Sequence, residues 1–339
     1  MAAGPEAGDL GVPAFVGRER RVEEWNAQDD REQREAERRW GPPCPDLTPR
    51  RAVLAGALLF VALAAAVWKF SLGLTPDRYL IVLLVPALVL RQPKKYLVDF
   101  VPFALLLILY SACRGFAHEL NPSPFAQPQL DVEKLLFAGH LPTVELQHLL
   151  GTARDSVTGR SAVIMTRLHF IVPPLLGFAL WVKRRSLFYR FGATMLALSF
   201  AACLVFLVYP AAPPWAAADR HLTPPLVHLT SPAATTSAGA SGVANATVTR
   251  LIPKNPYAAI PSLHAGYAFV VLFFVAALVA GTRWRRPAIA LAVVYALLQS
   301  TAVVYTGDHY VVDVLLGCTA ATLAYLGVHR LWRAWDLPD

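Results

Sequence analysis

Long apolar runs separated by short polar stretches fill the chain after its first 51 residues. A helix needs roughly 20 apolar residues to cross the hydrocarbon core of a bilayer, and most of these runs reach that length. They do not alternate apolar and polar residues as the strands of a membrane barrel do. The pattern therefore predicts an all-α, polytopic membrane bundle of about eight spans, at 52–72, 79–90, 97–116, 162–182, 187–208, 263–281, 287–306 and 310–329.

The run 79–90 is short and contains Pro86, so its length alone fits either a tilted span or a re-entrant segment. The basic residues between the runs favour a span. If all eight runs cross, every basic cluster falls on one side of the membrane, namely Arg50–Arg51, Arg91–Lys95, Lys183–Arg185, Arg283–Arg286 and Arg330–Arg333. By the positive-inside rule that side is cytoplasmic, and both termini are then cytoplasmic as well.

The composition agrees with a membrane protein and excludes other classes. Of the 339 residues, 55% are hydrophobic and only 16% are charged, whereas a soluble domain carries about 25% charged residues. The same apolar content excludes disorder over most of the chain. The net charge of +8 lies mainly in the loop clusters, so it reflects topology rather than nucleic-acid binding. Abundant Ala, Arg and Pro indicate a GC-rich bacterium, and hence its plasma membrane.

A first polar motif, Ile260-Pro261-Ser262-Leu263-His264-Ala265-Gly266, opens the sixth predicted span. Pro261 resists continuing a preceding helix, and Ser262 is a favourable N-cap. His264 then lies in the first helical turn, where free backbone N–H groups can bind an anion such as phosphate. By the predicted topology, this motif lies at the extracytoplasmic end of its helix.

A second polar motif, from Tyr305 to Asp313, lies at the same membrane level between the seventh and eighth spans. His309 and Asp313 are four residues apart and share a face if the helix has begun. A carboxylate in that position holds one imidazole nitrogen as a donor and leaves the other as a nucleophile or base. Gly307 permits an unusual backbone angle before the pair, and Asp308 is expected to cap the helix.

Two histidines and a carboxylate around an anion site indicate phosphoryl transfer. One histidine would attack phosphorus while the other protonates the leaving oxygen, and this chemistry requires neither a metal nor a cofactor. None of the four cysteines, Cys44, Cys113, Cys203 and Cys318, has metal-ligand spacing. The expected partners are a lipid phosphate or phosphodiester and the surrounding membrane lipids, with no nucleic acid.

Together the two motifs resemble those of the type 2 phosphatidic acid phosphatase superfamily. PSLHAG at 261–266 is followed, after one intervening span, by a G-x-HYxxD stretch at 307–313. Leu263 before His264 and the His309-Tyr310 pair are most similar to the inositol phosphorylceramide synthase branch. Further similarity to that branch lies in Asp131 with LLFAGHLPTVELQ (135–147), in Tyr110 with Arg114-Gly115, and in YPAAPPW (209–215).

The resemblance implies a role for each matching residue. His309 matches the phosphate-attacking histidine, and Asp313 matches its orienting carboxylate. His264 matches the histidine that protonates the leaving group, and Ser262 matches a phosphate-contacting position. The implied enzyme is a lipid phosphatase or phosphotransferase that acts at the extracytoplasmic face. If an alcohol rather than water resolves the phosphohistidine, it transfers a head group such as phosphoinositol.

The chain departs from the superfamily pattern at the cations that bind phosphate. A Lys with an Arg-Pro seven residues later normally precedes the PSxH motif, and neither is found here. A Ser-Arg normally begins the motif around the second histidine, but Ala302 and Val303 occupy those places. The candidates to replace these cations are predicted near extracytoplasmic helix ends and are Arg114, Arg167 and Lys254. His169, two residues after Arg167, is expected to line the site or to mark its edge.

The resemblance covers 97–330, which is predicted to form a six-span catalytic core. Residues 52–96 add two spans, and 331–339 form a cytoplasmic C-terminal tail. Residues 1–51 form a cytoplasmic N-terminal tail in which charges of both signs alternate densely between Arg18 and Arg39.

Two other classes of function stay open. A transporter or flippase would use the same polar cluster as a binding site, although no paired interrupted spans are evident in matching halves. A non-catalytic scaffold would recruit a protein partner through its charged tail.

Overall fold

The fold is built from helices. The computed structural model describes residues 76–231 and 255–335, with a few positions between 54 and 61. Within these residues there is no strand beyond isolated bridges. In chain order the helices are α3 (Pro76–Val89), α4 (Pro93–Leu120), α5 (Gln127–Leu136), α6 (Pro142–Leu150), α7 (Val157–Leu168), α8 (Val172–Lys183), α9 (Arg185–Val208), α10 (Pro214–Asp219), α11 (Leu263–Leu278), α12 (Arg285–Tyr305) and α13 (Val311–Ala334).

Five helical segments are long and apolar enough to cross a membrane within the described part of the chain. They are α4, the α7–α8 pair, α9, α12 and α13, and α11 is a shorter apolar helix. These six coincide with the last six predicted runs, so the prediction of a helical membrane bundle is confirmed. The N-terminal tail and most of the run 52–72 lie outside the described residues. The count of eight spans therefore stays a prediction.

The fourth predicted span, 162–182, differs from the expected single helix. Residues 169–171 separate α7 from α8, and Pro173 and Pro174 follow in the first turn of α8. Proline has no amide hydrogen, so these two cannot donate to the carbonyls of His169 and Phe170. The span is therefore interrupted at His169.

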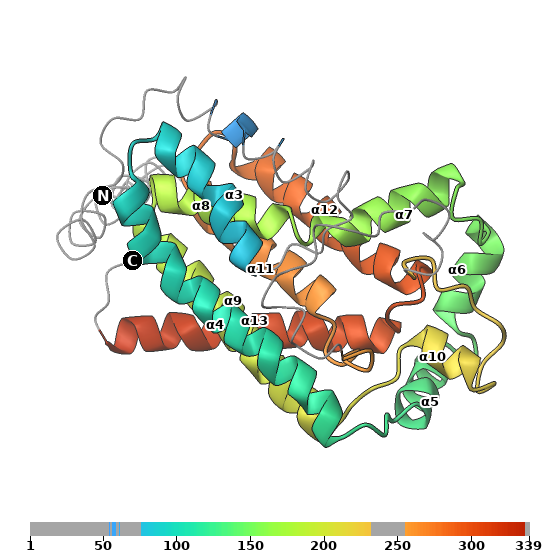
Figure 1. Ribbon diagram of the computed structural model, residues 1–339. Coiled ribbons are helices and arrows are strands. Elements are labelled where there is room, and N and C mark those ends of the chain that lie inside the picture. The colour runs from blue at the N-terminus through green and yellow to red at the C-terminus, as the bar shows by residue number, and fades with distance from the viewer. Residues whose placement is uncertain (1–53, 55, 59–60, 62–75, 232–254, 336–339) are drawn as a thin grey trace, which may run out of the picture.

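Helix α11 occupies the centre of the bundle. It packs against α8, α9, α12 and α13, while α4 packs against α9 and α3. A helix that is apolar all round is suited to such a position. Figure 1 shows α5, α6 and α10 gathered at one end of the bundle, far from the C-terminal end of α13. We call the end that carries α5, α6 and α10 the capped end.

A buried carboxylate joins three helices away from the capped end. Asp99 of α4 forms an ion pair with Arg185 of α9, with 2.6 Å between Oδ1 and the guanidinium nitrogen Nη2. The Trp181 indole of α8 donates to Asp99 Oδ2 at 2.7 Å, and the Tyr189 hydroxyl donates to Oδ1 at 2.6 Å. The Asp99 side chain is fully buried. It is tolerated there because both of its oxygens have donors.

Candidate active site

The PSLH segment forms the start of α11 as its sequence predicts. Ser262 is the N-cap, and its hydroxyl oxygen accepts a long hydrogen bond, 3.4 Å, from the Ala265 amide. The Ser262 amide donates to the carbonyl oxygen of Asp313 at 3.0 Å. One backbone hydrogen bond therefore links the two motifs, and it fixes the start of α11 against the first turn of α13.

Two glycines bring the backbones of α11 and α13 close together. A Cβ atom on Gly317 would lie 2.2 Å from the carbonyl oxygen of Ser262, closer than any side chain could stand. A Cβ atom on Gly266 would lie 3.2 Å from the carbonyl oxygen of Gly317. No local pattern in the sequence singles out Gly317, because its partner lies 55 residues earlier in the chain.

The second motif places His309 just before α13, with Asp313 in the helix's first turn. Gly307, with φ of 83°, provides the left-handed turn that ends α12. His309 Nδ1 lies 3.5 Å from Asp313 Oδ2, and both side chains are buried. Asp313 Oδ2 also accepts from the Tyr310 amide at 2.9 Å, closing a capping box around the start of the helix. The two residues therefore face each other although His309 precedes the helix.

The two predicted histidines are in direct contact. His264 Nδ1 lies 3.1 Å from His309 Nε2. The Asp313 carboxylate favours a proton on His309 Nδ1, which leaves a lone pair on Nε2. His264 Nδ1 must then carry the hydrogen that points at this lone pair. These tautomers are assigned from the contacts, and they give His309 Nε2 the electronic form of a nucleophile.

A third histidine lies beside this pair. His169, in the interruption between α7 and α8, packs its ring edge-on against His264 with 4.1 Å between the ring centroids. Its Nδ1 contacts the carbonyl oxygen of Thr166, so Nδ1 is the donor and Nε2 has the lone pair. His169 lines the cavity described below, whereas Arg167 does not. The expectation that His169 lines the site agrees with this position.

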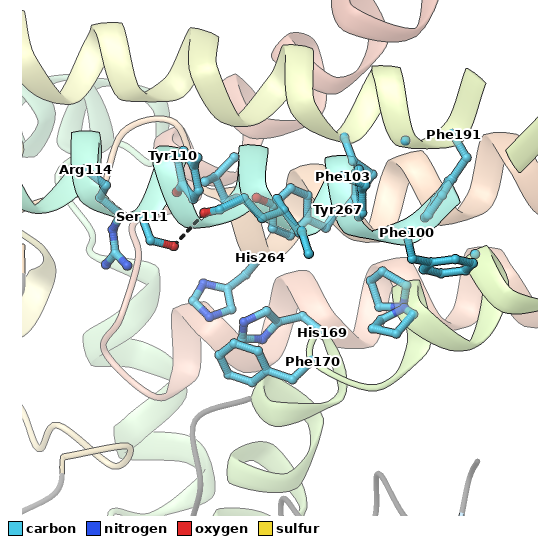
Figure 2. Close-up of a pocket in the computed structure, with 18 of the residues that line it drawn as sticks. Phe100, Phe103, Tyr110, Ser111, Arg114, His169, Phe170, Phe191, His264 and Tyr267 are labelled. Carbon is cyan, nitrogen blue, oxygen red and sulfur yellow. Dashed lines mark hydrogen bonds between the residues drawn. The ribbon is translucent and has the colours of Figure 1, made fainter. Parts of the chain in front are cut away.

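Arg114 is the predicted cation that the fold brings to the histidines. Its guanidinium donates to the Asn255 carbonyl at 3.2 Å, and the Asn255 side-chain amide donates back to the Arg114 carbonyl at 3.0 Å. Figure 2 shows Arg114 and Ser111 on α4 on the same side of the pocket as His264 and His169. Lys254 directly precedes Asn255 and lies outside the described residues.

A cavity of about 380 Å³ opens from these polar groups into the bundle. His169, His264, His309 and Arg114 line one part of it. The remainder is lined mainly by apolar side chains of α4, α8 and α9. Most of the labelled aromatic side chains in Figure 2 lie along this pocket. The arrangement suits an amphiphile with an anionic head, because the cation and imidazoles lie together and the rest of the wall is apolar.

Glu133 is a buried residue of the site that sequence reasoning missed. Its two carboxylate oxygens accept from the amides of Val311 and Val312 at 2.9 and 3.0 Å, which caps the start of α13. Burial raises the pKa of Glu133, and the nearby Asp313 raises it further, against the lowering effect of the two amides. Glu133 is three residues after Leu130, and both are fully buried. The sequence signal that could have identified Glu133 is an acidic residue on the apolar face of an amphipathic helix.

Asp308 does not cap α13, so that expectation is wrong. Its Oδ1 accepts from His228 at 2.9 Å and from Thr230 at 2.7 Å, and its Oδ2 accepts from Thr306 at 2.7 Å. Burial alone would raise the pKa of Asp308, but these hydrogen bonds outweigh it and lower the pKa. The carboxylate binds His228 and Thr230 to the turn before His309, while Asp313 and Glu133 cap α13.

Within residues 76–231 and 255–335, no group of three or more His, Cys, Asp or Glu side chains is arranged to hold a metal ion.

Known proteins resemble the chain over most of its length. Residues 144–327 match the model of the PAP2 superfamily. A phosphoinositol dihydroceramide synthase from Bacteroides thetaiotaomicron is 30% identical over 280 residues, which covers 79% of this chain and 87% of the relative. No solved structure is significantly similar to the chain.

Proposed function

Because this chain belongs to the PAP2 superfamily, we propose that it transfers a phosphate-linked head group between lipids through a phosphohistidine on His309. The chain is an integral membrane enzyme of the lipid phosphatase and phosphotransferase class. The observation that carries the mechanism is the contact between His264 Nδ1 and His309 Nε2 at 3.1 Å, with Asp313 behind His309.

In the first step, His309 Nε2 attacks phosphorus and a P–N bond forms. The bond between phosphorus and the lipid alcohol breaks, and the imidazolium form of His264 gives its proton to the departing oxygen. Asp313 stabilises the positive charge that develops on His309. Arg114 lines the cavity together with the histidines and stabilises the charge of the phosphate oxygens.

In the second step, an acceptor hydroxyl attacks the phosphohistidine. The P–N bond breaks, a new P–O bond forms, and the acceptor's proton passes to His264, which restores the starting state. Ser262 is fully buried and does not line the cavity, so we assign it the capping of α11, the helix that carries His264, and a phosphate contact of its hydroxyl stays a prediction. The relative's name supports phosphoinositol as the head group and a dihydroceramide as the acceptor. The loop charges support an extracytoplasmic site.

The test is to incubate the purified protein with isotopically labelled phosphatidylinositol and dihydroceramide in chelator, and to resolve the lipids by mass spectrometry. We expect phosphoinositol dihydroceramide and diacylglycerol in equal amounts. His309→Ala should form neither, whereas His140→Ala, at an exposed position, should match the wild type.

Other results would assign other functions. Free inositol phosphate that forms at a rate unaffected by dihydroceramide would make the protein a hydrolase of the phosphodiester rather than a transferase. Lipid movement between leaflets with no change in the phosphate ester would make it a flippase. Equal turnover by His309→Ala and the wild type would overturn the phosphohistidine mechanism.

A further inference from the structure

The cavity follows one face of α4 deep into the bundle. Its lining residues on this helix recur every three or four positions, from Arg114 through Leu107 to Phe100. From Phe100 to Arg114 the helix rises by fourteen steps of 1.5 Å, or about 21 Å. That is roughly two-thirds of a 30 Å hydrocarbon core. The cavity is thus elongated along α4, with the imidazoles near one end.

Aromatic side chains line the end of the cavity away from the histidines. Phe100 and Phe188 are both buried, and their ring centroids lie 4.7 Å apart. Trp181 packs edge-on behind Phe100 at 5.7 Å and is held by the Asp99 carboxylate. Phe191, which also lines the cavity, packs against Phe274 at 5.4 Å. Since these rings are supported from behind, this end is a fixed wall.

Two glycines set the width of the cavity near this wall. A Cβ atom on Gly177 would lie 3.3 Å from the Phe191 ring, and one on Gly192 would lie 3.4 Å from the Phe103 ring. Both glycines line the cavity. Any larger side chain at either position would therefore reduce the space between α4, α8 and α9.

We propose that this cavity holds one hydrocarbon chain of the lipid substrate and selects that chain by its length. This inference rests on the proposed function, which places the lipid phosphate at His264 and His309. With the phosphate fixed there, the aromatic wall limits how many methylenes fit. A chain that is too short leaves apolar wall exposed, and one that is too long is excluded. Each methylene gained or lost changes relative kcat/KM by about fourfold.

The test compares kcat/KM for a series of phosphatidylinositols from dodecanoyl to arachidoyl chains. The wild type should prefer one length. Phe191→Ala should favour longer chains and Gly192→Leu should favour shorter ones. Each should change the ratio of kcat/KM between neighbouring even-numbered chains by about fifteenfold. Leu105→Ala is the matched control, because Leu105 is on the same helix α4 but is 58% exposed on its outer side. It should leave the ratios unchanged.

A photolabelling measurement tests whether the cavity binds a lipid chain, and it does not require turnover. Phosphatidylinositol with a diazirine at the end of one acyl chain is photolysed with the wild-type protein, and the labelled residues are mapped by mass spectrometry. Labels at Phe100, Phe188 or Phe191 support the chain site. Labels confined to exposed positions such as Leu105 and Leu109 would overturn it.

The outcomes distinguish the two proposals. If the wild type is active but every variant changes kcat/KM by the same factor for all chain lengths, chain selection is wrong and the proposed function stands. If the wild type turns over no lipid, the proposed function fails, and the labelling pattern still decides whether the cavity binds a chain.

Discussion

At the scale of single residues, the candidate site depends on how three ionisable side chains are aligned. Asp313 lies behind His309, and His309 contacts His264. The carboxylate decides which nitrogen of His309 has the lone pair, and it stabilises the positive charge that forms when the ring is phosphorylated. A substitution that keeps the shape of Asp313 but removes its charge therefore tests the alignment directly.

Asp313→Asn should lower kcat for head-group transfer by about 10²- to 10⁴-fold, the usual range for loss of acid–base assistance. An amide can present its N–H₂ group to His309 Nδ1, which favours the wrong tautomer. KM should change little, because Asp313 does not line the cavity. The measurement is steady-state kinetics with the protein in nanodiscs. An unchanged kcat would contradict the orienting role.

Gly317→Ala should destabilise the protein and abolish transfer. The new methyl group would overlap the Ser262 carbonyl, 2.2 Å away, so α11 and α13 would have to separate and carry His264 away from His309. We expect a lower melting temperature in detergent together with loss of activity.

Gly327→Ala is the matched control for this prediction. Gly327 is in the same helix, and a Cβ atom there meets nothing within 4 Å. The control should keep full activity. Its melting temperature should equal that of the wild type or lie slightly above it, since alanine favours helix. Equal behaviour of the two variants would contradict the close approach of α11 and α13.

At the scale of helices, the capped end holds the site together from outside the bundle. Glu133 in α5 accepts from two amides at the start of α13, and Gln147 in α6 donates to the carbonyl of Tyr305 at the end of α12. Short helices thereby fix the two ends of the turn that carries His309. The unsatisfied amides of a helix N-terminus make such contacts favourable for a carboxylate.

Glu133→Gln should change how stability depends on pH. The folded-state pKa of Glu133 is raised above that of the unfolded chain. The folded protein therefore binds a proton more tightly, and stability falls as pH rises from the unfolded pKa through the folded one. The glutamine variant should lack that fall. The measurement is the melting temperature from acidic to neutral pH.

Transfer activity gives a second measurement for the same variant. A glutamine side chain has one acceptor oxygen for two amides, so we expect a roughly tenfold or greater loss of kcat, since a small misplacement of a reacting group is costly. Glu145→Gln, an exposed position on α6, should keep both the wild-type pH profile and the activity. A Glu133 variant indistinguishable from this control would refute the positioning role.

At the scale of the whole molecule, polar chemistry is concentrated at one end and a buried ion pair at the other. His309 precedes α13, whose start contacts α5 of the capped end, and the other end of the cavity is lined by Phe100, which packs on Trp181. If the basic loops are cytoplasmic, the capped end faces outward.

A single cysteine tests this orientation. In a chain lacking its four native cysteines, Leu222→Cys at the exposed capped end should react with a membrane-impermeant maleimide on intact cells. Gly281→Cys, in the exposed turn between α11 and α12, should react only after the cells are opened. The opposite pattern would place the site on the cytoplasmic side.

Features that depend on neighbours in the chain could be predicted from the amino-acid order alone. Apolar runs set the helices, Ser262 caps α11, and the four-residue spacing lets Asp313 reach His309. Such features follow from helical periodicity and from backbone amides within a few residues. Together with the two motifs, they were enough to predict the helical membrane bundle and the family.

Contacts between distant segments, in contrast, are established by the packing of the helices. Glu133 meets Val311 across 178 residues, His169 meets His264 across an interrupted span, and Gly317 meets the Ser262 carbonyl. The same packing brings Arg114 to the cavity and leaves Arg167 out of its lining. The reason is physical, because these contacts depend on the angles and depths at which helices pack. Those are set by the fit of many side chains at once, and no local pattern encodes them.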